Sequence, residues 1–210
     1  MEILKNFVVF EGCDGSGTTT QLNTFENFYP YNEPFSPPFY KTFEPTKGSI
    51  GKLIRLSLKK EIDLSPQAIA MLFAADRYEH LFGKEGIVER CKRGELVICD
   101  RYVPSSLVYQ GITCGEELPA SLNSNFPAPE LLLYFDIASE TALERLASRE
   151  TREIFEYLEF QIKARERYKA LLPEFLLKGV RVETLDASDP PEDVARKVWA
   201  IVKELPIFKR

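Results

Sequence analysis

The chain has 210 residues, of which 44% are hydrophobic and 28% are charged, and its formal net charge is −5. This length suits one domain that buries its core without disulfides or metals, and the acidic balance argues against binding to nucleic acid. The sequence contains no CxxC pair, no basic segment leading into an apolar run, and no stretch of about 18 apolar residues. We therefore expect a reduced, cytoplasmic protein without a membrane partner.

The first expected strand covers residues 7–10 and leads directly into a glycine-rich loop and the start of a helix. Gly12, four further residues, Gly17 and two threonines have the spacing of a phosphate loop. In such a loop, backbone N–H groups and the positive end of the following helix bind a nucleotide phosphate. Thr18 occupies the position of the motif's lysine. The loop therefore predicts phosphate binding, and the alternative is a plain glycine turn.

Further along the chain, apolar strand patterns alternate with helical patterns. We expect strands at residues 39–43, 95–99, 131–135 and 180–185, and helices at 19–28, 50–58, 66–93, 156–178 and 191–205. Gly83 and Gly86 interrupt the long third helix, and Pro104 begins a short one. Ser139 is expected to cap a further helix, the proline-rich segment 30–38 to be an extended connector, and residues 111–128 to be irregular.

This alternation predicts an α/β fold of the P-loop NTPase type, with a parallel five-stranded sheet and helices on both faces. We expect one domain over residues 1–210. Ligands of such sheets bind at the carboxyl ends of the strands, and the acidic residues that fall there are Asp14, Glu44, Asp100 and Asp186.

Five motifs in this order resemble the thymidylate kinase family, which phosphorylates dTMP with ATP. They lie at residues 10–17, 44–55, 72–77, 100–111 and 152–156 and span most of the chain. The resemblance implies an ATP-dependent dTMP kinase that uses Mg²⁺, has dTMP and ATP as its small-molecule partners, and forms a homodimer.

The phosphate loop should bind ATP and the metal. Its mechanics make the Thr19 hydroxyl a magnesium ligand, and Asp100, at a strand end, is the second expected ligand. In the family the acid inside the loop holds the acceptor's 3′-hydroxyl, which implies that role for Asp14; an exposed loop acid is the alternative. The residues expected at ATP are Gly12, Asp14, Gly15, Ser16, Gly17, Thr18, Thr19, Thr20 and Arg145.

Phe73, Asp76 and Arg77 are spaced to share one helix face. From the residues alone, a core phenylalanine beside a surface Asp76–Arg77 ion pair is the better interpretation, and His80 is a surface or capping residue. The resemblance implies instead that Phe73 stacks on thymine and Arg77 reaches the dTMP phosphate.

The resemblance also implies that Arg101 binds the acceptor phosphate, that Tyr109 selects deoxyribose, and that Gln110 lies near the base. Ser105 and Ser106 either read the pyrimidine edge or cap a helix. The full set expected at dTMP is Asp14, Glu44, Pro45, Phe73, Arg77, Arg101, Ser105, Ser106, Tyr109 and Gln110.

Arg145, Arg149 and Arg152 form a basic stripe at helical spacing, for which a solvated surface is the default interpretation. The resemblance implies a lid at about residues 149–156 that closes over the ATP phosphates, with Arg145 near the adenine. The residues expected to be catalytic are Asp14, Arg101, Arg149 and Arg152.

Two departures from the family pattern bear on catalysis. Thr18 replaces the phosphate-loop lysine, and Phe43 replaces the arginine before Glu44-Pro45. Our hypothesis is that Arg149 or Arg152 supplies the missing charge, with Lys47 as a second possibility. The alternatives to a dTMP kinase are a kinase for another deoxynucleoside monophosphate and a nucleotide-binding protein with impaired catalysis.

Overall fold

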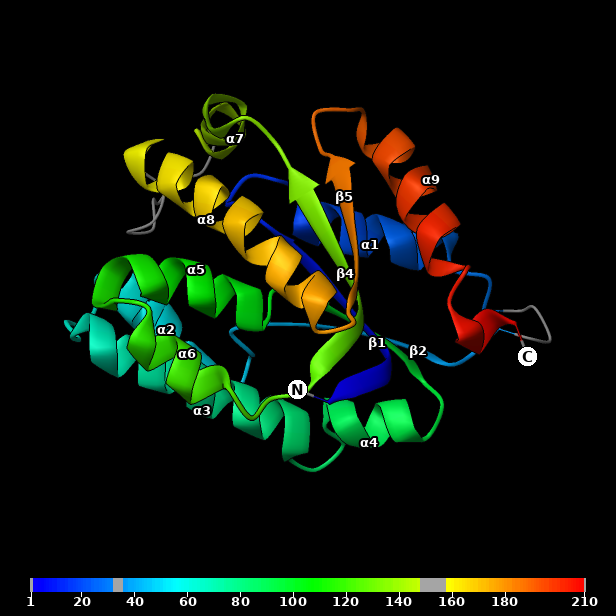
Figure 1. Cartoon of the computed structure of the whole chain (residues 1–210), viewed down its shortest axis with the longest axis horizontal. Coiled ribbons are helices and arrows are strands. Elements are labelled where there is room, and N and C mark those ends of the chain that lie inside the picture. Colours follow the sequence, from blue (N-terminus) through cyan, green and yellow to red (C-terminus); the bar gives the residue numbers. More distant parts are fainter. Residues whose placement is uncertain (1, 32–35, 148–157, 210) are drawn as a thin grey trace.

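Five strands form one parallel sheet in the computed structural model, which describes residues 2–31, 36–147 and 158–209 (Figure 1). The order across the sheet is β2-β3-β1-β4-β5. The strands are β1 Ile3–Gly12, β2 Phe39–Phe43, β3 Leu96–Asp100, β4 Ala128–Asp136 and β5 Arg181–Asp186. This confirms the predicted fold class. Because all pairs are parallel, the loop after β1 and the acidic ends of β3, β4 and β5 share one edge of the sheet.

The central strands are unbroken apolar runs because helices cover both of their faces. In β1, Phe7 and Val9 belong to one core, and Val8 and Phe10 belong to the core on the opposite face. All four side chains are fully buried. The period-2 alternation of a strand therefore feeds two separate cores from one short segment.

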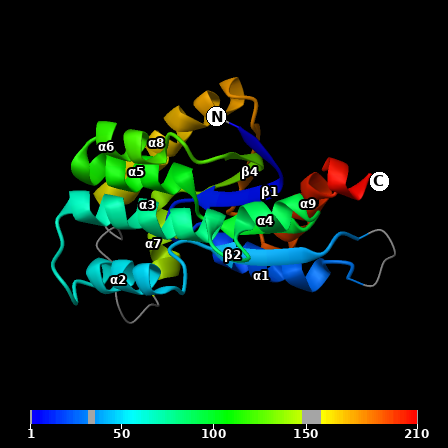
Figure 2. The ribbon, with the colours of Figure 1, turned by 90° about the horizontal axis from the view of Figure 1, so that it is seen from below.

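Helices α1 Thr18–Phe28 and α9 Pro191–Val202 cover one face of the sheet (Figure 1). The opposite face carries a larger group, in which α3 runs beside α5 and α6 (Figure 2). This group comprises α2 Ser49–Leu58, α3 Pro66–Phe82, α4 Ile87–Lys92, α5 Val103–Cys114, α6 Glu117–Asn123 and α8 Leu158–Leu177. The remaining helix, α7 Ser139–Leu146, follows β4, and a short 3₁₀ turn, Pro206–Phe208, lies near the C-terminus.

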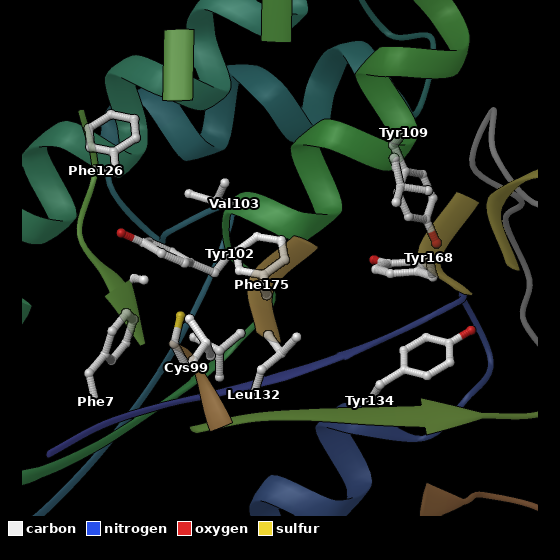
Figure 3. Close-up of a cluster of buried hydrophobic side chains, with 14 of the residues drawn as sticks. Phe7, Cys99, Tyr102, Val103, Tyr109, Phe126, Leu132, Tyr134, Tyr168 and Phe175 are labelled. Atoms are coloured by element: carbon white, nitrogen blue, oxygen red, sulfur yellow. The ribbon is translucent and has the colours of Figure 1, made fainter. Parts of the chain in front are cut away.

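The core under α5 and α8 is rich in aromatic side chains (Figure 3). Phe7 meets the edge of Tyr102 at a ring-centroid distance of 5.1 Å, and Tyr134 packs on Tyr168 at 5.2 Å. These rings are buried, although each tyrosine carries a hydroxyl. The hydroxyl of Tyr168 donates to Glu11 near the end of β1, so this core contains a polar position close to the loop after β1.

Three local predictions need correction or refinement. The segment 111–128 is not irregular, because α5 continues to Cys114 and α6 follows; Pro119 sits in the first turn of α6, where its missing N–H costs no helical bond. Ser139 is the first residue of α7 and does not cap it, since Ala138 holds the cap position. The predicted break at Gly83 and Gly86 is confirmed, and it separates α3 from α4.

Among the described residues, no helix combines the length and apolar composition needed to cross a membrane. The predicted lid at about 149–156 lies outside the described residues.

Candidate active site

The loop between β1 and α1 is shaped by its glycines. Gly15 and Gly17 have φ values of 85° and 90°, which residues other than glycine rarely adopt. Gly15 also packs tightly, since a Cβ there would lie 2.3 Å from the carbonyl oxygen of Ala142 in α7. At Gly12 a Cβ would lie 2.8 Å from the carbonyl oxygen of Phe135 in β4. The loop is therefore held against β4 and α7 and curls around the start of α1.

This loop borders a cleft of about 570 Å³, which we call the loop cleft. Its other walls include Asp100, Arg101 and Arg145, and residues after β5 such as Asp189. Every residue predicted to contact ATP lines the cleft except Gly12, which packs behind it. Arg145 reaches across the cleft wall and donates to the carbonyl oxygen of Ala187 at 3.0 Å.

The predicted magnesium ligands meet beside the loop. The Thr19 hydroxyl donates to Asp100 Oδ2 at 2.5 Å. Asp100 is buried, and its Oδ1 has no hydrogen-bond partner in the part of the chain that the structure describes. A hydroxyl and a carboxylate are hard oxygen ligands of the kind Mg²⁺ prefers. This pair therefore fits the metal that the phosphate-loop motif implies.

A second pocket opens between α3 and α5, and we call it the α3–α5 pocket. Its lining holds every residue predicted to contact dTMP except Ser106: Asp14, Glu44, Pro45, Phe73, Arg77, Arg101, Ser105, Tyr109 and Gln110. Leu58 and Tyr102 also line it and were not predicted. Asp14, Glu44 and Arg101 border both this pocket and the loop cleft. The two spaces therefore meet at these side chains.

Arg101 occupies the junction in a left-handed conformation, with φ 72°. Its guanidinium donates to Asp14 Oδ1 at 2.7 Å, to the Tyr109 hydroxyl at 3.3 Å and to the carbonyl oxygen of Gly12. The backbone N–H of Asp14 also donates to the Tyr109 hydroxyl, at 3.1 Å. Arg101 is thus fixed to the phosphate loop on one side and to α5 on the other.

Arg77 is buried, so the surface ion pair expected from the residues alone is wrong. Its Nε donates to Glu44 Oε2 at 2.8 Å, its Nη2 donates to Ser106 Oγ at 3.0 Å, and its Nη1 donates to Asn123. Asp76 turns to a different partner and accepts from the backbone N–H and the hydroxyl of Thr46. The charge of Arg77 is therefore neutralised by Glu44 inside the wall of the α3–α5 pocket.

His80 is not a surface or capping residue, because its side chain is only 10% exposed. Its Nδ1 lies 3.1 Å from Glu44 Oε1, and its Nε2 lies 2.6 Å from the Thr42 hydroxyl. Glu44 is thereby held between His80 and Arg77. The sequence offered no signal for this contact beyond the i, i+3 spacing of Arg77 and His80.

Of the cations proposed to replace the missing lysine, the structure describes only Lys47. Arg149 and Arg152 lie outside the described residues. Lys47 is exposed, and its Nζ lies 5.6 Å from the ring centroid of Phe43, which lines the loop cleft. The guanidinium of Arg55 lies at the same distance from that ring. Thr18 itself is buried at the start of α1.

Comparison with known proteins agrees with this geometry. A family model described as thymidylate kinase matches residues 10–198. A protein of Treponema pallidum named as a thymidylate kinase is 42% identical over 207 residues, covering 97% of this chain and 98% of its own length. Its counterpart in Pyrobaculum aerophilum is 38% identical, covering 97% of this chain and 99% of its own length. One from Methanococcus aeolicus is 39% identical and covers 83% of each. The chain therefore belongs to the thymidylate kinase family.

Proposed function

We propose that this protein transfers the γ-phosphoryl group of ATP to dTMP, giving ADP and dTDP, with Mg²⁺ as cofactor. The observation that carries the proposal is the junction of two pockets at Asp14 and Arg101, one built on a phosphate loop and the other on Phe73, Arg77 and Tyr109. Phosphoryl transfer demands the two nucleotides end to end, with positive charge and N–H donors where they meet.

The loop cleft would take the ATP phosphates. Backbone N–H groups between Gly15 and Thr19 would cradle the phosphates, and the positive end of α1 would add to their attraction. Thr19 and Asp100 would hold Mg²⁺, which when bound neutralises charge on the phosphate oxygens. Arg145 would lie over the adenine side of the cleft.

The α3–α5 pocket would take dTMP. We assign the acceptor phosphate to Arg101, because it borders both spaces, and the inner, base end of the pocket to Arg77, whose Nε, Nη1 and Nη2 all donate to protein acceptors. Phe73 offers its ring to the base, and Gln110 lies in the same wall. Asp14 accepts the sugar's 3′-hydroxyl, and Tyr109 crowds the 2′ position.

The charge that Thr18 does not supply would come from the lid arginines, Arg149 and Arg152, closing over the ATP phosphates. We extend the proposal to the whole chain as one kinase domain with a lid at about residues 149–156.

We also propose a cytoplasmic homodimer. Helix α3 carries three exposed apolar side chains on one face: Met71, Tyr78 and Phe82 are 52%, 60% and 47% exposed. Their spacing of seven and four residues aligns them along the helix, as a self-complementary interface requires. Sedimentation equilibrium measures the mass of the particle in solution. We expect the mass of a dimer, and the mass of a monomer for the wild-type protein at micromolar concentration would reject the homodimer.

The relatives' names favour dTMP over another deoxynucleoside monophosphate, and favour a kinase over a nucleotide-binding protein without turnover. A coupled ADP-release assay with ATP and Mg²⁺ separates the three, using dTMP, dUMP, UMP and dGMP as acceptors. We expect turnover with dTMP well above that with the others. Preference for another acceptor, or binding of dTMP by calorimetry without turnover, would reject the proposed function.

A further inference from the structure

A buried carboxylate lies behind Arg101 and has no role in the site described so far. Glu11, near the end of β1, is fully buried. Its Oε1 accepts hydrogen bonds from the backbone N–H groups of Tyr102 at 2.8 Å and Ser105 at 3.2 Å. Its Oε2 accepts from the hydroxyls of Ser105 at 2.7 Å and Tyr168 at 2.9 Å. Such a set of donors matches an ionised carboxylate, which can only accept.

The same two hydroxyls also contact Arg101. Its Nη1 lies 3.2 Å from the Tyr168 hydroxyl and 3.5 Å from Ser105 Oγ, and it shares its two hydrogens among these two and the acceptors at Gly12 and Tyr109. Each hydroxyl can therefore accept from the guanidinium and donate to Glu11. The direction of the hydrogen bonds is consistent along both paths, and it connects a buried cation to a buried anion through hydroxyl groups.

We propose that Glu11 and Tyr168 are positioning residues for Arg101, which hold its guanidinium at the junction of the two pockets. The inference rests on the proposed role of Arg101 at the acceptor phosphate. Tyr168 belongs to α8, the helix that follows the predicted lid in the sequence, so the contact also ties α8 to the phosphate-binding arginine. Ser105 also links the two groups, because its hydroxyl donates a hydrogen bond to Glu11.

The pKa of Glu11 makes this contact depend on pH. Burial raises the pKa of Glu11 to about 7, while Arg101 and the donated hydrogen bonds act to lower it. Its titratable and charged neighbours are Arg101 and Tyr102 at the β3–α5 junction, Asp14 through Arg101, Cys99 on β3 and Tyr168 on α8. Burial holds the pKa values of Cys99, Tyr102 and Tyr168 well above their usual range, so these groups stay neutral at pH 7.

Tyr168→Phe tests the contact because it removes one hydroxyl and keeps the ring. Tyr134→Phe is a matched control: Tyr134 packs on Tyr168 in the same core, and its buried hydroxyl has no partner among the residues described. The two hydroxyls point to different sides of the cluster (Figure 3). The readout is calorimetric binding of dTMP and of thymidine, which lacks the phosphate.

We expect Tyr168→Phe to weaken dTMP binding about tenfold, the effect of losing one hydrogen bond to a charged group. Thymidine binding should stay within about twofold of wild type, and Tyr134→Phe should leave both ligands unaffected. Unchanged dTMP binding in Tyr168→Phe, or equal losses for dTMP and thymidine, would overturn the proposal. Absence of dTMP turnover by the wild-type enzyme would instead reject the proposed function. The comparison of dTMP and thymidine binding would still test the role of Tyr168.

A second variant, Glu11→Gln, keeps the shape of the side chain and removes its charge. Protonation of Glu11 removes the anion that faces Arg101, so wild-type kcat/KM for dTMP should fall as pH falls through about 7. In Glu11→Gln this decline should be absent and activity should be low throughout. A variant that keeps the wild-type pH profile would overturn the role of Glu11.

Discussion

The loop cleft and the α3–α5 pocket meet at Arg101, but they differ in how far backbone and side-chain groups form their walls. The loop side of the loop cleft is formed mainly by backbone, with glycines at positive φ packed near α7 and β4. The α3–α5 pocket is formed by side chains, and its wall contains the buried ion pair of Glu44 and Arg77, with His80 behind it against Glu44.

This difference explains how each region responds to substitution. A site made of backbone N–H groups loses little when a side chain is removed, but it is sensitive to atoms added where the chain is tightly packed. A site made of buried charges is sensitive to the removal of any one partner, since the other charge is left desolvated. We therefore expect Thr18 in place of lysine to be better tolerated than a change at Glu44 or Arg101.

The largest effect should follow from Arg101→Ala, because Arg101 serves both spaces. We expect kcat to fall about 10³-fold, or about 4 kcal/mol, the loss seen when a preorganised donor to the transition state is removed. Arg101→Lys should recover only part of this, since lysine cannot reproduce the planar fork. Steady-state kinetics with dTMP measures both. An alanine variant within tenfold of wild type would contradict the shared role of Arg101.

Glu44→Gln should have the next largest effect, this time on stability. It leaves Arg77 buried without its carboxylate, which costs about 3 kcal/mol of unfolding free energy. Glu26→Gln is the matched control, because it removes the partner of Lys41 at the surface and should cost less than about 1 kcal/mol. Urea unfolding gives both values. Equal losses would show that burial of the pair has no special importance.

A smaller effect should separate two glycines of the phosphate loop. Both Gly15→Ala and Gly17→Ala place a Cβ at positive φ, which costs about 1–2 kcal/mol. Only at Gly15 would the Cβ also overlap α7, whereas the space around Gly17 is open. The unfolding free energy of Gly15→Ala should therefore be about 2 kcal/mol lower than that of Gly17→Ala. The reverse order of stability would contradict the packing of the loop against α7.

Much of the fold follows from local pattern. The apolar runs at residues 7–10, 96–99 and 131–135 indicate buried strands, because each run is too short for a helix and a strand covered on both faces is continuously apolar. Helix α6 was missed because Pro119 resembles a breaker, and its tolerance in a first turn depends on where the helix begins.

The candidate site divides in the same way. The phosphate loop was predicted from its motif, and most residues that line the α3–α5 pocket were named from the family resemblance. Glu11, His80 and Tyr168 were not, since their partners lie far away in the sequence. Glu11 and Tyr168, for example, are 157 positions apart, and only the packing of α8 on the sheet brings them together.

The most direct test of the account is the turnover of wild-type enzyme beside Thr18→Lys, with ATP, Mg²⁺ and dTMP. If the backbone of the loop and cations outside it serve the donor phosphates, wild type turns over dTMP and the added lysine changes kcat by less than about tenfold. A wild-type enzyme that binds both nucleotides without turnover, and gains activity only with Lys at position 18, would contradict it.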